Sequence, residues 1–227
     1  MFIHAIIPVK HLHDSKRRLA HLLSADERAD MIGRFLDNLL LTLNATPGID
    51  RTLVVTCDPA VVRLARRRGA DVLLEPAADG LNAAAARGMA HAAAQGATAV
   101  LLLPADLPFA RVEDIEAMLR PLEQGLGARG QGLGEERSSL APSPWPLTPS
   151  LVVCPDETED GTNALLLAPP GDFTFRYGPG SFRAHLAEAA RRGRSAHVVP
   201  APGLRFDLDT ESDWLVYNGY LVGVGEE

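Results

Sequence analysis

The chain has 227 residues, of which 46% are hydrophobic, enough to bury one large core in a single α/β domain, 1-227. Its formal net charge of -7 comes with no basic stripe, which excludes no small phosphate ligand but disfavours nucleic acid as a partner. Cys57 and Cys154 are far apart, so they indicate neither a disulfide framework nor a zinc site. No apolar run is long enough for a signal peptide or a membrane span, and we expect a cytoplasmic protein with no membrane contact. Length, composition and charge do not decide between a monomer and a homodimer.

Short apolar runs alternate with helical patterns along the chain, which is typical of an α/β fold. Strands are predicted at Ile3 to Val9, Thr52 to Thr56, Ala70 to Leu74, Ala99 to Leu103, Ser150 to Cys154, Ala164 to Ala168 and Ala196 to Val199. Helices are predicted after the Ser24/Glu27 capping box, from Asp58 to Gly69, from Asn82 to Ala94, from Val112 to Leu122, from Ser181 to about Gly193, and from Thr210 to Tyr217. Residues 124-149 are rich in glycine, proline and serine and are predicted to form a flexible surface insertion without chemistry.

The most informative stretch is Leu101 to Pro108, an apolar strand that ends at a carboxylate between two prolines. The unbroken apolar character of Ala99 to Leu103 favours a parallel strand covered on both faces, and ligands bind beyond the carboxyl ends of such strands. Asp106 is therefore a candidate site residue. The alternative is that Asp106 caps the helix beginning near Arg111 or shapes a turn, which is the commoner role of a loop aspartate.

Two further segments follow predicted strand ends and offer groups that suit a nucleotide. Lys10, Lys16, Arg17 and Arg18 could bind phosphate oxygens, although their loop lacks the glycines of a Walker cradle and could equally be a solvated basic loop. In Asp79-Gly80-Leu81-Asn82, the Asn82 amide could read the edge of a nucleobase or serve as an ordinary helix cap.

A second candidate site lies in the later part of the chain. Gly178-Pro179-Gly180-Ser181 precedes a helix, and free backbone N–H groups, the Ser181 hydroxyl and the positive helix end would suit a phosphate or carboxylate. His185, one turn into that helix, could add a donor or be structural. Asp207 and Asp209 would face one side of an extended chain and could join Asp106 in a magnesium site; the alternatives are a buried hydrogen-bonded acid and a helix cap.

Taken together and in order, these motifs resemble the CofC/FbiD guanylyltransferases along nearly the whole chain. The residues that carry the resemblance are Pro8-Val9-Lys10, Ser15 to Ala20, Gly80-Leu81-Asn82, Leu103 to Pro108, Asp160-Gly161-Thr162-Asn163-Ala164-Leu165, Tyr177 to Phe182 and Asp207-Leu208-Asp209-Thr210. The departures from the family pattern are the insertion and Tyr177, where phenylalanine is more usual. The resemblance implies a three-layer α/β/α nucleotidyltransferase fold, Rossmann-like and similar to nucleotide-diphospho-sugar transferases, with a mostly parallel sheet.

The resemblance also implies an activity and the roles of individual residues. Such enzymes transfer GMP from GTP to the phosphate of phosphoenolpyruvate in coenzyme F-420 biosynthesis, releasing pyrophosphate. Asp106, Asp207 and Asp209 would hold Mg²⁺; Asp106, Lys10 and Lys16 would be catalytic. Lys10, Lys16, Arg18, Gly80 and Asn82 would bind GTP, and Thr162, Gly178 and Ser181 would bind phosphoenolpyruvate.

The residues leave the acceptor open among phosphoenolpyruvate, 2-phospho-L-lactate and 3-phospho-D-glycerate, because these acids differ by a double bond or a hydroxyl. Two other functions compete with this assignment. One is a nucleotidyltransferase of the same fold that acts on a sugar phosphate, a molybdenum cofactor or a cytidylyl acceptor. The other is a noncatalytic nucleotide-binding regulatory protein, for which the three acids would be superfluous. No protein base is required, since a phosphate monoester is mostly dianionic at neutral pH.

Overall fold

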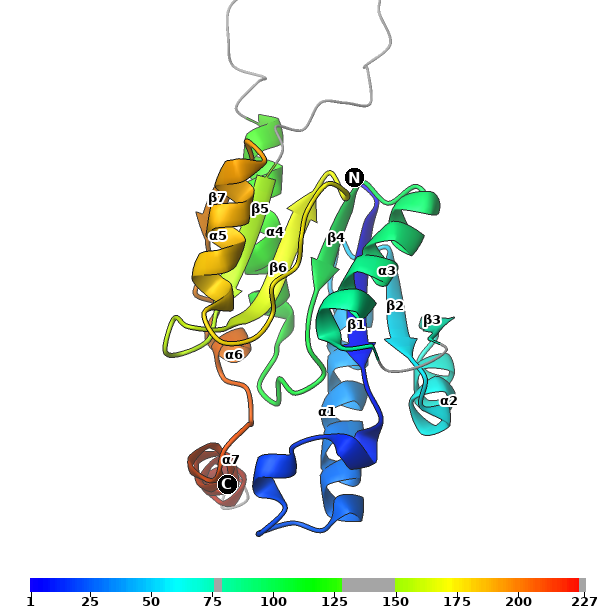
Figure 1. The fold of residues 1–227 in the computed structure, drawn as a ribbon, viewed down its shortest axis with the longest axis vertical. Coiled ribbons are helices and arrows are strands. Elements are labelled where there is room, and N and C mark those ends of the chain that lie inside the picture. The colour runs from blue at the N-terminus through cyan, green and yellow to red at the C-terminus, as the bar shows by residue number, and fades with distance from the viewer. Residues whose placement is uncertain (76–78, 128–149, 225–227) are drawn as a thin grey trace, which may run out of the picture.

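The structure, a computed structural model, describes residues 1–75, 79–127 and 150–224. Within these residues, seven strands form one sheet in the order β3-β2-β1-β4-β6-β5-β7, as Figure 1 shows. The strands are β1 (Ile3–Val9), β2 (Arg51–Thr56), β3 (Asp71–Leu74), β4 (Ala99–Leu102), β5 (Ser150–Pro155), β6 (Thr162–Ala168) and β7 (Ser195–Val198). Only β6 of these seven runs antiparallel to its neighbours, which confirms the predicted mostly parallel sheet.

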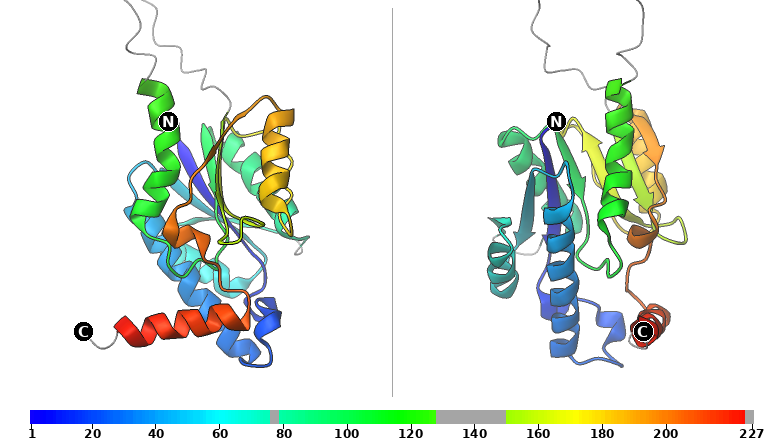
Figure 2. Two further views of the ribbon diagram at one scale, coloured as in Figure 1. Left: turned by 90° about the vertical axis from the view of Figure 1, so that its left-hand side faces the viewer. Right: turned by 180° about the vertical axis from the view of Figure 1, so that it is seen from behind.

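Helices cover both faces of the sheet and make a three-layer α/β/α arrangement (Figure 2). On one face lie α1 (Ala25–Ala45), α2 (Pro59–Arg67), α4 (Val112–Gly127) and the short α6 (Pro202–Arg205). On the other face lie α3 (Leu81–Ala94) and α5 (Ser181–Arg191). The last helix, α7 (Glu211–Val224), lies beyond the carboxyl ends of the parallel strands. Among the described residues, no helix combines the length and apolar character that a membrane span requires.

The local sequence explains where several of these helices begin. The Ser24 hydroxyl accepts the N–H of Glu27 at 3.2 Å, and the Glu27 carboxylate accepts the N–H of Ser24 at 2.8 Å, which is the predicted capping box. Asp58 caps α2 by accepting the N–H of Ala60 at 2.7 Å. Gly80, with a φ of 94°, precedes α3, so a glycine rather than Asn82 occupies the capping position.

Three differences from the sequence-based prediction bear on function. Thr162 and Asn163, which precede the predicted strand Ala164 to Ala168, are the first residues of β6, because the backbone pairing with β5 extends to Pro155 opposite Thr162. Leu12–Asp14 and Arg17–Leu19 form short 3-10 turns within the basic loop. Of the predicted insertion 124-149, residues 124–127 belong to α4, and residues 128–149 lie outside the described residues.

The close packing of α3 against the sheet gives a stability prediction. A Cβ at Gly88 would lie 2.6 Å from Ile6 Cγ2 and 3.0 Å from Val55 Cγ2, whereas a Cβ at Gly33 in α1 meets nothing within 4 Å. We expect Gly88→Ala to lower the free energy of unfolding by about 1–3 kcal/mol through overpacking. Gly33→Ala should raise it by roughly 0.5–1 kcal/mol, because alanine is the better helix former. Urea unfolding measures both, and equal effects of the two substitutions would contradict this packing.

Candidate active site

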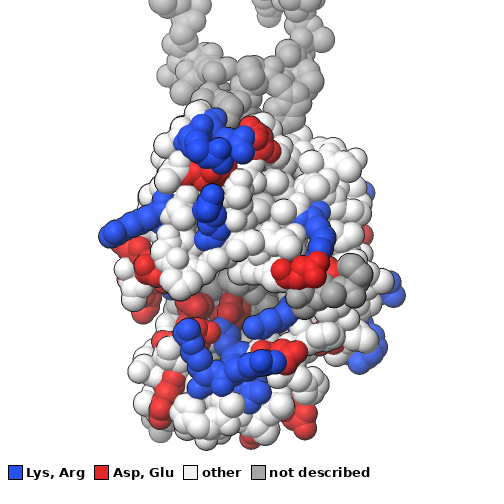
Figure 3. Space-filling view, in the orientation of Figure 1, with Lys and Arg blue, Asp and Glu red and all other residues white. Residues whose placement is uncertain are grey.

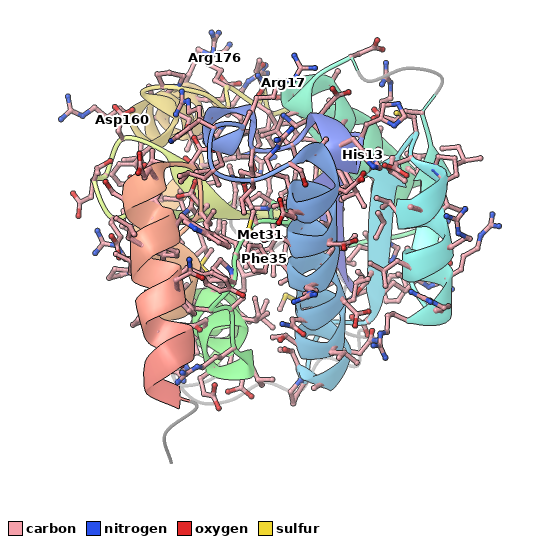
Figure 4. The ribbon with its side chains drawn as sticks, turned by 90° about the horizontal axis from the view of Figure 1, so that it is seen from below. His13, Arg17, Met31, Phe35, Asp160 and Arg176 are labelled. Carbon is pink, nitrogen blue, oxygen red and sulfur yellow. The ribbon has the colours of Figure 1, made fainter. Side chains whose placement is uncertain are left out.

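A cleft of about 370 Å³ opens where β1 and β4 end. Five of the predicted site residues line it: Lys10, Lys16, Gly80, Asp106 and Asp209. Figure 3 shows basic and acidic side chains gathered around a hollow in the lower half of the molecule. In the view onto this edge in Figure 4, Arg17, Asp160 and Arg176 lie toward the α3 and α5 side, and Met31 and Phe35 lie on α1.

The basic loop is held in place by buried side chains. Asp58 accepts the N–H of Leu12 at 2.9 Å, and the Arg28 guanidinium donates to the carbonyls of Ser15 at 3.0 Å and Leu23 at 2.7 Å. Arg28 is only 7% exposed, and these backbone carbonyls provide the hydrogen bonds that its buried guanidinium requires. This residue was not among the predicted site residues. Its signal is an arginine on the apolar face of an otherwise amphipathic helix.

Lys16 lies at the centre of the cleft and contacts two of the predicted acids. Its Nζ donates to Asp106 Oδ2 and, at 3.1 Å, to Asp209 Oδ1, and its side chain is only 6% exposed. Burial alone would lower the pKa of Lys16, but Asp106 and Asp209 outweigh it and raise that pKa. Arg18 Nη1 donates to Asp209 Oδ2 at 2.8 Å. Burial would raise the pKa of Asp209, but Lys16 and Arg18 lower it.

The third acid, Asp207, has a different environment. Burial, reinforced by the nearby charge of Asp106, raises the pKa of Asp207 to about 6. Asn163 Nδ2 donates to Asp207 Oδ1 at 3.1 Å and to the Arg205 carbonyl at 3.0 Å, which fixes this acid relative to β6. As predicted, Asp207 and Asp209 alternate with the buried Phe206 and Leu208. The role of Asn163 was missed, although it lies in the Asp-Gly-Thr-Asn motif.

The donor set fits a divalent cation. Asp106 Oδ1 is buried and has no hydrogen-bond partner in the described part of the chain. The negative charge of Asp106 also helps to raise the pKa of Asp207, so the two carboxyl groups lie close enough to interact. Carboxylate oxygens are the ligands that Mg²⁺ takes alongside water and substrate phosphate. The described residues contain no preformed cluster of three or more ligand side chains. Instead, the ammonium group of Lys16 lies between Asp106 and Asp209.

Thr162 lies at the start of β6, close to the first turn of α5. Its Oγ1 is 3.0 Å from His185 Nδ1. The free N–H groups predicted before α5 are instead bonded within the protein. Asp160 Oδ2 accepts the N–H of Gly180 at 2.9 Å, the Asp160 carbonyl accepts that of Phe182 at 3.0 Å, and the Gly178 carbonyl accepts that of Ser181 at 3.0 Å. The Asp160 carboxylate thus accepts the N–H of Gly180, one of the groups that were predicted to bind a ligand anion.

Asn82 makes contacts that the sequence analysis did not predict. Its Oδ1 accepts the N–H of Tyr177 at 2.6 Å, and its Nδ2 donates to the Tyr177 carbonyl at 3.2 Å. Both ends of the amide therefore join α3 to the segment before α5. Thr162, Gly178 and Ser181 lie beside this contact rather than among the residues that line the cleft.

The fold is shared with solved nucleotide-handling transferases. A structure from Desulfovibrio desulfuricans, provisionally assigned to the nucleotide-diphospho-sugar transferases, aligns with a TM-score of 0.68 at 15% identity, covering 96% of this chain and 87% of that one. A nucleotidyl transferase from Methanothermobacter aligns with a TM-score of 0.56 at 16% identity, covering 98% and 99%. The fold is therefore that of the nucleotidyltransferases.

The family is shown by sequence. The family described as "Guanylyl transferase CofC like" matches residues 3–125 and 148–218, and this chain belongs to it. A phosphoenolpyruvate guanylyltransferase from Rubrobacter xylanophilus is 38% identical over 213 residues, covering 94% of this chain and 92% of that protein. One from Sphaerobacter thermophilus is 35% identical over 209 residues, covering 92% and 89%. The predicted family is confirmed, and the chain is a guanylyltransferase.

The environment of His185 gives a prediction for stability against pH. Burial lowers the pKa of His185 from 6.5 to about 4, so between these values the unfolded chain binds a proton that the folded protein excludes. The contribution of His185 to the free energy of unfolding is fully present above pH 6.5 and declines as the pH falls toward 4. Asp207 acts in the opposite direction, because its raised pKa lets the folded state take up a proton first.

The variant His185→Gln removes one of these two opposing contributions. As the pH falls from 6.5 toward 4.5, we expect its free energy of unfolding to improve relative to wild type by on the order of 1 kcal/mol per pH unit. Urea unfolding at several pH values measures the difference. Parallel stability curves for the two proteins would contradict a neutral buried histidine.

Proposed function

We propose that this guanylyltransferase transfers GMP from GTP to the phosphate of phosphoenolpyruvate, forming enolpyruvyl-2-diphospho-5'-guanosine and pyrophosphate in coenzyme F-420 biosynthesis. The observation that carries the proposal is the convergence of Lys10, Lys16, Asp106 and Asp209 on one cleft. The relatives from Rubrobacter and Sphaerobacter are named phosphoenolpyruvate guanylyltransferases, which supports phosphoenolpyruvate as the acceptor. The resemblance to the CofC/FbiD family supports the pathway.

In the donor half of the site, Lys10, Lys16 and Arg18 bind the triphosphate. Lysine and arginine suit this role because both are cationic donors that match phosphate oxygens. Gly80 brings the backbone before α3 to the wall of the cleft, where a nucleoside can approach it without meeting a side chain. Asn82, through its contact with Tyr177, holds α3 beside the acceptor segment and close to the guanosine.

The three acids complete the donor half. Asp106, Asp207 and Asp209 would hold Mg²⁺, with the unpartnered Oδ1 of Asp106 as one ligand. Bound there, the ion would neutralise triphosphate charge and help to orient the α-phosphorus. Asn163 keeps the Asp207 carboxylate in position, and the cationic side chains of Lys16 and Arg18 balance the remaining acidic charge.

In the acceptor half, we assign phosphoenolpyruvate to Thr162, Gly178 and Ser181, with the two serine and threonine hydroxyls as donors, because the backbone N–H of Ser181 is already bonded to the Gly178 carbonyl. An oxygen of its phosphate attacks the α-phosphorus of GTP, the bond from that phosphorus to the β-bridging oxygen breaks, and pyrophosphate leaves with the electron pair. The acceptor phosphate arrives ionised, since its second pKa is near ~6, so no side chain has to remove a proton. The work of the protein is positioning and charge stabilisation.

Asp106→Asn tests the catalytic assignment. We expect it to lower GTP-dependent pyrophosphate release by about 10²-fold or more while the protein remains folded, because the amide cannot supply the carboxylate charge. Asp71→Asn is the matched control: Asp71 begins β3, at the opposite edge of the sheet, and its exposed pair with Arg51 is 3.6 Å long. Turnover retained in Asp106→Asn, or lost equally in the control, would refute the assignment.

A comparison of acceptors tests the substrate. With GTP fixed, we expect phosphoenolpyruvate to give the highest kcat/KM among phosphoenolpyruvate, 2-phospho-L-lactate and 3-phospho-D-glycerate, with formation of the guanylylated product followed by mass. A higher value for either of the other acids would replace the acceptor while leaving the donor half intact. Binding of GTP with no turnover of any acid would instead favour a regulatory nucleotide-binding protein.

A further inference from the structure

His185 is the fully buried histidine of α5, and both of its ring nitrogens have partners. Nε2 lies 3.0 Å from the backbone nitrogen of Arg176, and Nδ1 lies 3.0 Å from Thr162 Oγ1. The ring packs edge-on against Tyr177, with 4.9 Å between centroids, and lies 5.9 Å from Phe173. These contacts on several sides restrict the ring to one orientation.

The direction of each hydrogen bond follows from its chemistry. The backbone N–H of Arg176 can only donate, so Nε2 must be the unprotonated, accepting nitrogen. Burial keeps the imidazole neutral by lowering the pKa of His185, and the nearby charge of Glu188 only partly opposes this. A neutral ring with an accepting Nε2 carries its hydrogen on Nδ1. Nδ1 therefore donates to the Thr162 oxygen.

This direction decides what the Thr162 hydroxyl can do. If Nδ1 were unprotonated, it would accept the hydroxyl hydrogen and leave Thr162 nothing to donate. With Nδ1 as the donor, the hydroxyl hydrogen must point away from the ring. Thr162 begins β6, whose antiparallel pairing with β4 places it at the same edge of the sheet as the loop that carries Asp106. Its side chain points to the face that carries α5, opposite to the side chain of Asn163.

We propose that His185 is a positioning residue for the acceptor, which directs the Thr162 hydroxyl hydrogen toward an anionic oxygen of the phosphorylated acid by donating to the Thr162 oxygen. This inference rests on the proposed function, which assigns the acceptor to Thr162. The Arg176 N–H makes His185 a donor toward Thr162, and the rings of Tyr177 and Phe173 hold the imidazole in place. His185 itself touches neither substrate nor cofactor.

Two amide variants separate this role from a structural one. In His185→Asn, the side-chain amide nitrogen reaches the approximate position of Nδ1 and can still donate to Thr162, but the N–H of Arg176 loses its partner. In His185→Gln, the amide oxygen reaches the approximate position of Nε2 and keeps the Arg176 bond, but the donor to Thr162 is lost. Each variant thus keeps one of the two hydrogen bonds.

We expect His185→Gln to raise the KM for the acceptor by about tenfold or more, as the loss of a hydrogen bond to a charged group does, with the KM for GTP unchanged. His185→Asn should stay within about threefold of wild type, although it loses a backbone partner. Thr162→Val should resemble His185→Gln and add little to it in the double variant, since both remove the same bond. A larger acceptor defect in His185→Asn, or additive defects in the double variant, would overturn the proposal.

The tautomer can be measured without any substrate. In ¹⁵N-labelled wild-type protein, the long-range ¹H–¹⁵N spectrum should show His185 protonated at Nδ1 and unprotonated at Nε2. The opposite tautomer would overturn the inference whatever the acceptor proves to be. If phosphoenolpyruvate is not turned over but this tautomer is observed, the proposed function fails instead, and the variants are then assayed with the acid that the enzyme uses.

Discussion

The arrangement of the site depends on one strand that runs against the others. In the sheet, β6 pairs antiparallel with β4, with Leu102 opposite Leu165. The start of β6 therefore lies at the same edge as the end of β4, which brings Thr162 and Asn163 close to the loop that carries Asp106. In an all-parallel sheet the Asp-Gly-Thr-Asn motif would lie at the opposite edge. The reversal of β6 thus brings the proposed acceptor residues to the same edge of the fold as the proposed donor residues.

Charge balance organises the donor half. Asp106, Asp207 and Asp209 approach one another from two distant parts of the chain, and such proximity would be unfavourable without a cation. Lys16, buried to 6% exposure, supplies one by contacting two of the acids, and Arg18 adds a second on Asp209. Lys16 does not compensate all of the acidic charge. Asp106 Oδ1 has no hydrogen-bond partner among the described residues, and the pKa of Asp207 is raised. A divalent cation is complementary to this uncompensated acidic charge, and it could take phosphate oxygens of a nucleotide as its further ligands.

Much of this fold could be predicted from the sequence because apolar runs and capping signals are local. The bounds of β1 were predicted to the residue, and the capping box and the alternation of Asp207 and Asp209 with buried neighbours were confirmed. What escaped prediction depends on contacts between distant residues. The amide of Asn82 pairs with the backbone of Tyr177, the Asp160 carboxylate accepts the N–H of Gly180 before α5, and Arg28 donates to the backbone of the loop that carries Lys16. Arg28 stands out in the sequence as an arginine on the apolar face of α1, but no local pattern shows which distant group each of these side chains contacts.

The central claim is that acceptor and nucleotide meet at the edge shared by β4 and β6. It is tested most directly by a crystal structure with an α,β-methylene analogue of GTP, which cannot release pyrophosphate, together with phosphoenolpyruvate. The account predicts the acceptor phosphate against Thr162, with an oxygen roughly 3–3.5 Å from the α-phosphorus and opposite the bond to the methylene bridge. An acceptor bound away from Thr162, or a triphosphate remote from Lys16 and Asp106, would contradict it.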